Sequence, residues 1–361
     1  MDQFCDLSSV ILVNLAFLAS KPTGHTVYAK NLLPGLSALD PVLLSGQNIP
    51  PYQCYPISDQ LTPDQGTKGH FNRLKWTQFE LPKIYHQLQS NLIFSPIPEA
   101  PIFTKCRYIV TLHDFIPLRF PRFTSPLTQY YRFYIPHVLA QAQHILSDSE
   151  STANDAIEFY KIPSNKITVI PLAYDNQHFR FLDLPTKNYF LYVGRHDPYK
   201  NIGRALSAFS RLPKDYEFWI AGSPDPRFTP QLQQQAESLG IRDRIKFLSY
   251  VSYAELPALI NQATALVFTS LWEGFGLPVL EAMACGTPVI TSNLSSIPEV
   301  AGDATILVNP YRESEIFDAM NAIVQDSSLR TQLREKGLDR AQSFSWQTTA
   351  NQTAEILKRY L

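Results

Sequence analysis

The sequence predicts an α/β protein made of two doubly wound domains, each a parallel sheet covered by helices on both faces. At 361 residues the chain is longer than a single hydrophobic core usually supports, so two domains are expected. Its second half alternates short apolar runs with helical segments. This alternation is typical of parallel strands joined by right-handed crossovers.

The C-terminal half carries the clearer pattern. We expect its strands at residues 189–193, 217–221, 245–248, 265–270, 288–292 and 305–308. We expect its helices at residues 201–212, 230–239, 253–263, 277–285 and 313–326. A stretch rich in Pro, Asp and Asn at residues 171–188 is the expected linker, so we place the domain boundary near residue 175.

The N-terminal half alternates less regularly. It is expected to hold strands at residues 9–17, 91–94, 108–112, 144–147 and 166–170, with a turn at residues 20–24 and a helix at residues 25–36. The Pro-, Gln- and Gly-rich residues 46–69 are expected to form a loop. Residues 127–142 predict a helix interrupted near Pro136.

The net charge of −1 argues against a nucleic-acid-binding protein, because such proteins usually carry a large basic excess. The charge is unevenly distributed, however. Residues 68–132 hold nine Lys and Arg and three Asp and Glu, a balance of +6. This basic, aromatic-rich stretch predicts contact with an anionic membrane or an anionic acceptor, and a solvated charged face is the simpler alternative.

The four cysteines, Cys5, Cys54, Cys106 and Cys285, are scattered, without the paired spacing of a zinc site or the density of a disulfide framework. A reducing cytoplasm fits this pattern best. The apolar run Val10–Ala19 contains Asn14 and is too short to span a bilayer, so we expect neither a signal peptide nor a transmembrane helix.

The most informative motif sets two acids, Glu273 and Glu281, around a Gly-Phe-Gly turn between a predicted strand and a predicted helix. Gly274 and Gly276 lack side chains, so a ligand can approach the backbone there. A helix that starts at Leu277 offers unpaired amides and the positive end of its dipole, which suit a phosphate. Both acids can face one small volume and bind hydroxyl groups.

A second motif places two cations, Arg195 and Lys200, in the loop that follows the predicted strand 189–193. Two cations there can hold a diphosphate and offset the charge that grows on it as a bond breaks. The alternative is a solvated loop, but cations beside a helix N-terminus are unfavourable unless an anion binds with them.

Two residues of the first half also follow predicted strands. Gly24 lies where a backbone could approach the same phosphates, although turns need glycine in any case. His113 follows the strand 108–112, where an imidazole can exchange a proton with a reacting hydroxyl near neutral pH. A structural histidine is the alternative.

Two motifs are missing. The sequence has no Asp-x-Asp pair to hold a metal ion on a diphosphate, so we expect a metal-independent site without a cofactor. The segment Gly274–Val279 lacks the third small residue of a dinucleotide fingerprint and follows a late strand, which argues against a dehydrogenase.

These motifs together resemble the retaining glycosyltransferases of family 4, which have the GT-B fold of two facing Rossmann-like domains with a cleft between them. In the C-terminal half the resemblance rests on Tyr192–Arg195, Glu273–Pro278, Glu281–Val289 and Ile297–Val300. In the N-terminal half it is thinner and rests on Gly24 and His113–Pro117.

The resemblance implies that Glu273 contacts the hydroxyls of the transferred sugar and that Glu281 binds the nucleotide ribose. It implies that Arg195 and Lys200 bind the diphosphate and that His113 lies beside the anomeric centre. The backbone of Gly274, Phe275, Gly276 and Leu277 would line the sugar and the distal phosphate, and the base would lie against Tyr250 and Val251.

Three further features bear on the comparison. Many relatives carry a glycine pair where this chain has Thr23-Gly24, and a glycine where it has Ser249. Trp346 suits the family's last helix, which crosses back to the first domain. The implied domains are therefore residues 1–174 for the acceptor and 175–345 for the nucleotide sugar, with residues 346–361 as the returning helix.

The resemblance predicts transfer of a hexose, with retained configuration and by front-face attack, to a glycan or lipid-linked acceptor in the cytoplasm or at the cytoplasmic face of a membrane. His113–Pro117 is similar to a stretch of family 4 mannosyltransferases, which favours GDP-mannose as donor, with UDP-glucose next. A sugar-nucleotide epimerase, a glycan phosphorylase and a non-catalytic sugar-nucleotide sensor are the alternatives.

Overall fold

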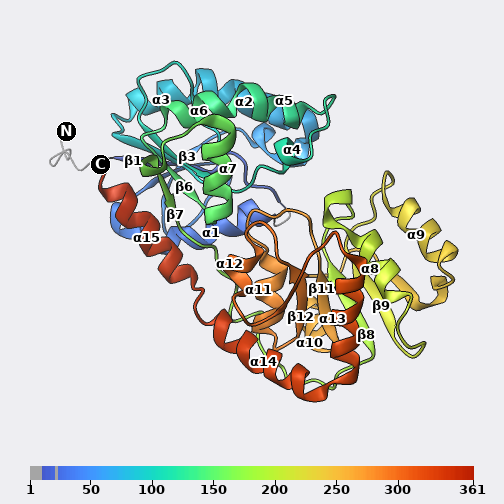
Figure 1. Ribbon diagram of the computed structural model, residues 1–361. Coiled ribbons are helices and arrows are strands. Elements are labelled where there is room, and N and C mark those ends of the chain that lie inside the picture. Colours follow the sequence, from blue (N-terminus) through green and yellow to red (C-terminus); the bar gives the residue numbers. More distant parts are fainter. Residues whose placement is uncertain (1–9, 21–22) are drawn as a thin grey trace. The chain divides into compact units, whose positions relative to one another are not determined.

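The computed structural model describes residues 10–20 and 23–361 and divides the chain into two compact units (Figure 1). Unit 1 comprises the chain up to Leu172 together with Trp346–Leu361, and unit 2 comprises Ala173–Ser345. Cys5, the start of the strand predicted from residue 9, and Lys21-Pro22 of the predicted turn lie outside the described residues.

Unit 1 contains a seven-stranded sheet in which every pair of neighbours is parallel, in the order β3-β2-β1-β4-β5-β6-β7. Its strands are β1 (Ile11–Asn14), β2 (Val42–Ser45), β3 (Gln53–Pro56), β4 (Leu92–Ser95), β5 (Tyr108–Leu112), β6 (His144–Ser147) and β7 (Ile167–Val169). The central strands are entirely buried, as expected for a sheet that is covered on both faces.

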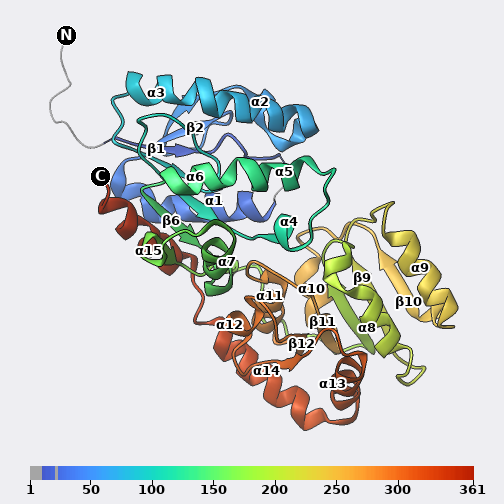
Figure 2. The ribbon, with the colours of Figure 1, turned by 45° about the horizontal axis from the view of Figure 1, so that its top comes forward.

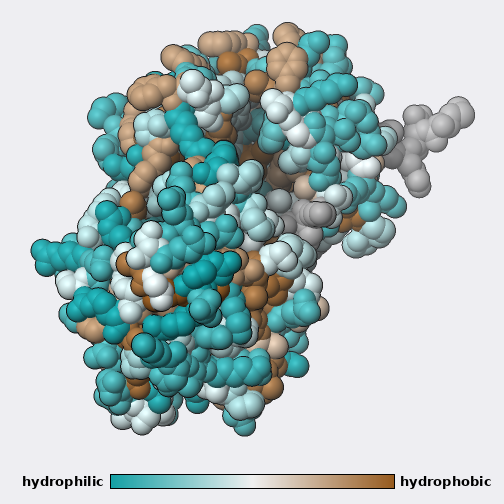
Figure 3. All heavy atoms as spheres, turned by 90° about the vertical axis from the view of Figure 1, so that its right-hand side faces the viewer, coloured by the Kyte–Doolittle hydropathy of each residue, from teal (hydrophilic) through white to brown (hydrophobic). Residues whose placement is uncertain are grey.

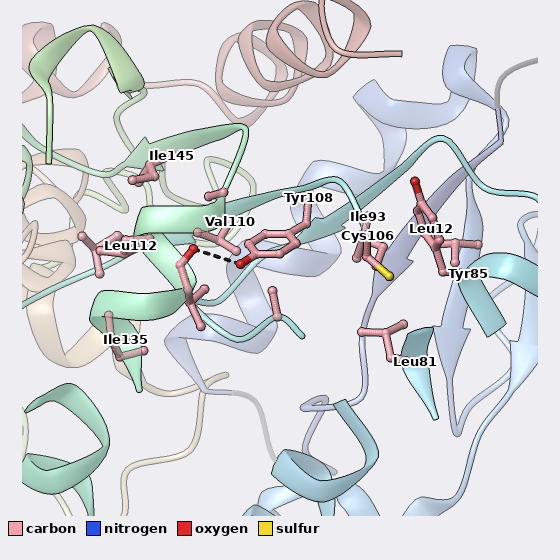
Figure 4. Packing of buried hydrophobic residues seen from close by; sticks show 14 of the residues in the cluster. Leu12, Leu81, Tyr85, Ile93, Cys106, Tyr108, Val110, Leu112, Ile135 and Ile145 are labelled. Carbon is pink, nitrogen blue, oxygen red and sulfur yellow. Dashed lines mark hydrogen bonds between the residues drawn. The ribbon is translucent and has the colours of Figure 1, made fainter. Parts of the chain in front are cut away.

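The helices of unit 1 are α1 (Gly24–Leu36), α2 (Gly66–Phe79), α3 (Leu81–Gln87), α4 (Ile116–Arg119), α5 (Pro126–Phe133), α6 (Ile135–Gln141), α7 (Glu150–Tyr160) and α15 (Trp346–Lys358). Side chains from α3, α5, α6 and α7 form one apolar core with the strands, in which the Tyr108 hydroxyl donates to the Val138 carbonyl at 3.1 Å (Figure 4). The last helix, α15, packs closely on α1. A Cβ on Gly35 would lie 2.5 Å from the Cβ of Ala350, so this approach requires glycine.

Unit 2 contains a six-stranded parallel sheet in the order β10-β9-β8-β11-β12-β13. Its strands are β8 (Tyr189–Val193), β9 (Glu217–Ala221), β10 (Ile245–Leu248), β11 (Ala265–Phe268), β12 (Val289–Ser292) and β13 (Ile306–Val308). Its helices are α8 (Ile202–Phe209), α9 (Thr229–Ser238), α10 (Leu256–Asn261), α11 (Leu277–Ala284), α12 (Ile297–Ala301), α13 (Glu313–Gln325) and α14 (Ser327–Ala341). The strand order reverses between β8 and β11: β8, β9 and β10 follow one another toward one edge of the sheet, and β11, β12 and β13 toward the other.

The predicted class, two doubly wound α/β domains, is confirmed, but one local prediction is wrong. Residues 46–69, expected to be loop, contain β3 and the start of α2. The predicted interruption of the helix 127–142 near Pro136 is confirmed: two helices divide at Tyr134, and Pro136 lies in the first turn of α6, where a missing N–H costs nothing. A separate helix, α14, follows α13 and was not expected.

Candidate functional site

The ends of two neighbouring strands bring Lys200 and Glu273 together in unit 2. Lys200 follows β8, Glu273 follows β11, and the two strands pair side by side. The Nζ of Lys200 lies 2.6 Å from Oε1 of Glu273, and both side chains are largely buried. Burial alone would lower the pKa of Lys200, but the Glu273 carboxylate outweighs it and the pKa is raised, so the ammonium keeps its charge.

The position of Lys200 is fixed by Asn201, which the sequence reasoning missed. Asn201 has a left-handed backbone at φ 62° and is buried. Its side-chain amide donates to the carbonyls of Thr269 at 3.0 Å and Pro310 at 2.7 Å. Asparagine tolerates this backbone region better than most residues, so an Asn directly after the lysine was the signal available in the sequence.

Arg195 belongs to the same loop but is placed differently. Three quarters of its side chain is exposed, its Nε lies 3.1 Å from Asp197, and its Nη2 donates to the Tyr199 hydroxyl at 3.3 Å. The structure therefore sets one predicted cation in a buried ion pair and the other at the surface.

The Gly-Phe-Gly turn is held by the residues that follow β12. The Ser296 hydroxyl lies 3.0 Å from the carbonyls of Glu273 and Phe275, and the Glu273 amide donates to the Ser295 hydroxyl at 3.0 Å. Gly276 has φ 105°, and a Cβ there would lie 2.5 Å from Ile297. The turn leads into α11, whose first residue is Leu277, and no side chain in the described part of the chain caps its start.

Glu281 lies in the second turn of α11 with its carboxyl half-buried. Within residues 10–20 and 23–361 this carboxyl has neither a hydrogen bond nor an ion pair. Burial raises its pKa to about 7. A carboxyl group without a partner in this position is suited to accept hydrogen bonds from the hydroxyls of a ligand.

Tyr253, an aromatic residue that was not predicted, lies within electrostatic reach of this acid. Burial raises the pKa of Tyr253, Asp175 raises it further, and the charge of Glu281 adds to the effect. Its ring stacks on His178 with centroids 3.8 Å apart, and its hydroxyl donates to Asp175 at 3.1 Å. Tyr250 and Val251 lie earlier in the same loop, Tyr250 strongly exposed and Val251 half-buried.

His113 lies in unit 1 at the end of β5, next to Asp148 at the end of the neighbouring strand β6. Its Nδ1 is 2.6 Å from the Asp148 carboxylate, and its Nε2 is 2.8 Å from the Pro96 carbonyl. Burial would lower the pKa of His113, but Asp148 and Pro96 raise it above its ordinary value. Burial raises the pKa of Asp148 while His113 holds it back, and we assign the proton to the imidazole.

Gly24 is the first residue of α1, and a Cβ there would meet no atom of the described residues within 4 Å. The fold of unit 1 therefore does not require glycine at this position. Its predicted role beside a phosphate stays a prediction.

Two features of the described residues concern metal ligands and membrane spans. No three His, Cys, Asp or Glu side chains in that part of the chain gather as metal ligands. No helix among the same residues is long and apolar enough to cross a bilayer.

The site of unit 2 therefore combines two cations, two acids and an open helix start at the carboxyl ends of parallel strands. It lies where the strand order reverses, which is the place where doubly wound sheets bind nucleotides and other phosphate-bearing ligands. This fold and site define the class of doubly wound α/β proteins with two Rossmann-like units, whose strand ends are suited to a phosphate-bearing ligand.

Comparison with known proteins identifies the family. Residues 174–340 match the family "Glycosyl transferases group 1", and residues 22–178 match "Glycosyltransferase Family 4". The O-antigen chain mannosyltransferase B of Escherichia coli is 30% identical over 269 residues, 70% of each chain. The O-antigen chain mannosyltransferase RfbU of Salmonella typhimurium is 34% identical over 218 residues, 60% of each chain. The chain belongs to glycosyltransferase family 4.

Solved structures share the fold across nearly the whole chain. Sucrose-phosphate synthase from Thermosynechococcus elongatus aligns over 97% of this chain and 98% of its own, with a TM-score of 0.75 at 18% identity. Anabaena HepE in complex with UDP and glucose aligns over 97% and 100%, with a TM-score of 0.74 at 17% identity. The predicted GT-B fold is confirmed.

Proposed function

We propose that this glycosyltransferase moves a hexose from a nucleotide sugar to a hydroxyl of a glycan or lipid-linked acceptor and retains the anomeric configuration. The observation that carries the proposal is the buried Lys200–Glu273 pair beside the Gly-Phe-Gly turn. Glu273 gives one carboxylate oxygen to Lys200, and its other oxygen is left to accept hydroxyls of the sugar.

The diphosphate binds to the charges and amides around that pair. Lys200 and Arg195 supply positive charge, and the start of α11 supplies amide donors. Glu281 accepts hydrogen bonds from the ribose, and the base lies toward Tyr250 and Val251. His113, held as a cation by Asp148, lies beside the anomeric centre.

The reaction proceeds at one face of the sugar. The bond between the anomeric carbon and the phosphate oxygen breaks, and the acceptor oxygen bonds to the same carbon from the same side. The acceptor proton passes to the departing phosphate oxygen, whose charge Lys200 and Arg195 stabilise. Glu273 is committed to Lys200 and is not the attacking group. The reaction needs no metal ion.

GDP-mannose is the favoured donor because the relatives from E. coli and Salmonella are named O-antigen chain mannosyltransferases. UDP-glucose is next, since a structural neighbour was solved with UDP and glucose. The enzyme acts in the cytoplasm, at a membrane face where a lipid-linked acceptor is available.

Thermal shift against a panel of nucleotide sugars tests the donor. A ligand at 100 times its dissociation constant stabilises the folded state by about 2.7 kcal/mol. GDP-mannose should raise the melting temperature in the presence of a chelator, and Lys200→Ala should abolish the response. A response to UDP-glucose alone would overturn the favoured donor, and a strict need for a divalent ion would overturn metal independence.

A further inference from the structure

Unit 1 exposes large apolar side chains within one stretch of sequence. Six of them, between residues 71 and 133, are more than half exposed: Phe71 65%, Phe79 63%, Phe103 78%, Phe123 69%, Leu127 55% and Phe133 69%. In unit 2 the apolar side chains exposed to that degree are Tyr250 and Tyr311, which carry a hydroxyl. Exposed phenylalanines in this number mark a surface that contacts something apolar.

Helix α2 shows the arrangement most clearly. Phe71, Lys75 and Phe79 recur every four residues and lie on one exposed face. The opposite face carries buried polar groups, Arg73 and Thr77. The helix thus turns its phenylalanines outward, with a lysine between them, and its polar groups inward. Packing against the sheet does not require this pattern.

Helix α5 and the loop before it expose a second group of apolar side chains. Phe123, Leu127 and Phe133 are exposed there, and the Arg132 guanidinium lies 4.8 Å from the centre of the Phe123 ring. The Gln78 side chain donates to the Tyr134 hydroxyl at 2.8 Å, which ties α2 to the end of α5.

Helices α2 and α5 both lie along the top of the view in Figure 1, and Figure 2 shows α2 above α5 when that side comes forward. Figure 3 shows brown and tan side chains at the surface, at the top of the view, beside teal ones.

Some charged side chains of this stretch are buried in ion pairs, and others stay exposed at the surface. Arg73 is buried in an ion pair with Glu99 at 2.8 Å, and Arg119 pairs with Asp155 at 2.5 Å. The acid Glu80 at the surface is paired with Lys83 at 2.9 Å. The cations that stay exposed beside the phenylalanines are Lys68, Lys75, Lys105, Arg122 and Arg132.

We propose that the outer face of α2, together with Arg122–Phe133, docks on an anionic phospholipid bilayer. The phenylalanine rings enter the boundary between headgroups and acyl chains, and the neighbouring cations pair with lipid phosphates. The interleaving of cations with apolar rings favours a lipid surface over a protein partner, because a bilayer offers both chemistries everywhere on its face. The purpose of this docking, access to a lipid-linked acceptor, rests on the proposed function.

Vesicle co-sedimentation tests the docking. The full chain should sediment with vesicles of phosphatidylcholine and phosphatidylglycerol but not with phosphatidylcholine alone. The double substitution Phe71→Ser/Phe79→Ser should weaken this binding at least tenfold. Lys68→Gln/Lys75→Gln should weaken it and reduce its sensitivity to salt. Tyr311→Ser, an equally exposed aromatic of unit 2, serves as the matched control and should bind as the wild type does.

The outcomes separate this inference from the proposed function. Nucleotide-sugar binding measured without lipid should be the same in all these variants as in wild type. A wild-type protein that binds anionic vesicles but no nucleotide sugar would count against the proposed function alone. Wild-type protein that stays in the supernatant with anionic vesicles would overturn the docking proposal, as would a Phe71→Ser/Phe79→Ser variant that sediments like wild type.

Discussion

Each unit joins a cation to a carboxylate across two neighbouring strand ends, and the two pairs differ in what they leave available. Lys200–Glu273 in unit 2 and His113–Asp148 in unit 1 both have a contact of 2.6 Å. Glu273 has a second oxygen without a partner in the described structure, beside a glycine turn. Both ring nitrogens of His113 already have hydrogen-bond partners, the Asp148 carboxylate and the Pro96 carbonyl. The same parallel topology therefore builds one pair that can accept a ligand and one that is closed.

The closed pair changes the role expected of His113. The sequence suggested an imidazole that exchanges a proton with a hydroxyl, but both ring nitrogens already donate within unit 1. We infer that His113 acts by its fixed positive charge. The second Asp148 oxygen is buried and has no hydrogen-bond partner in the described part of the chain, so the cation is its principal compensation.

Breaking the closed pair should have the largest effect. Asp148→Ala leaves a buried imidazolium unpaired and should lower the free energy of unfolding by about 3–5 kcal/mol, measured by urea denaturation. Because the folded pKa of His113 is raised, its contribution is complete below pH 6.5 and is lost as pH rises through the folded pKa, so the deficit should shrink at alkaline pH. Asp303→Ala, at an exposed ion pair with Lys336, should change little. A pH-independent deficit would contradict the charged assignment.

Breaking the open pair should cost turnover. Lys200→Ala removes a charge contact to the departing phosphate, which typically costs about 2.7–4 kcal/mol of transition-state stabilisation, or two to three orders of magnitude in kcat. Steady-state transfer assays measure this. Lys246→Ala, which removes an exposed cation paired with Glu217, is the matched control and should keep wild-type turnover. An unchanged kcat in Lys200→Ala would remove Lys200 from the site.

The pH dependence of stability and of donor affinity tests the role of Glu281 in unit 2. Its folded pKa of about 7 exceeds the ordinary 4.5, so stability is lost as pH rises between these values and is level above them. Glu281→Gln should therefore gain up to about 3 kcal/mol relative to wild type between pH 4 and pH 8. Wild-type donor affinity should rise over pH 6–8, because ribose hydroxyls favour the ionised carboxylate, and the variant should show no such rise. If the free energy of unfolding changed with pH in the same way in wild type and in Glu281→Gln, this prediction would be contradicted.

The smallest effects are expected when Gly276 and Gly24 are replaced by alanine. Gly276→Ala forces a side chain into a left-handed backbone and against Ile297, and should cost about 1–3 kcal/mol of stability along with donor affinity. Gly24→Ala meets open space at a helix start, and its stability should be unchanged or slightly higher. Equal stability losses in the two variants would show that the turn is not constrained as described.

The sequence predicted the features that have a strong local signal. Buried strands such as β11 are short apolar runs, and Glu273, Gly276 and Glu281 lie in a motif whose spacing reflects a strand, a turn and a helix start. The edge strand β3 was not predicted because Gln53–Pro56 is half exposed and ends in proline, which edge strands tolerate. The partners Asp148, Asn201 and Tyr253 escaped because each contacts residues far away in the sequence.

The Lys200–Glu273 site is proposed to transfer sugar with retention. Proton NMR of the product formed from GDP-mannose and a soluble glycan acceptor, in the presence of a chelator, tests this most directly. The product should carry a new glycosidic bond with the anomeric configuration of the donor, formed by wild type and lost in Lys200→Ala. A product of inverted configuration, or an undiminished rate in Lys200→Ala, would contradict it.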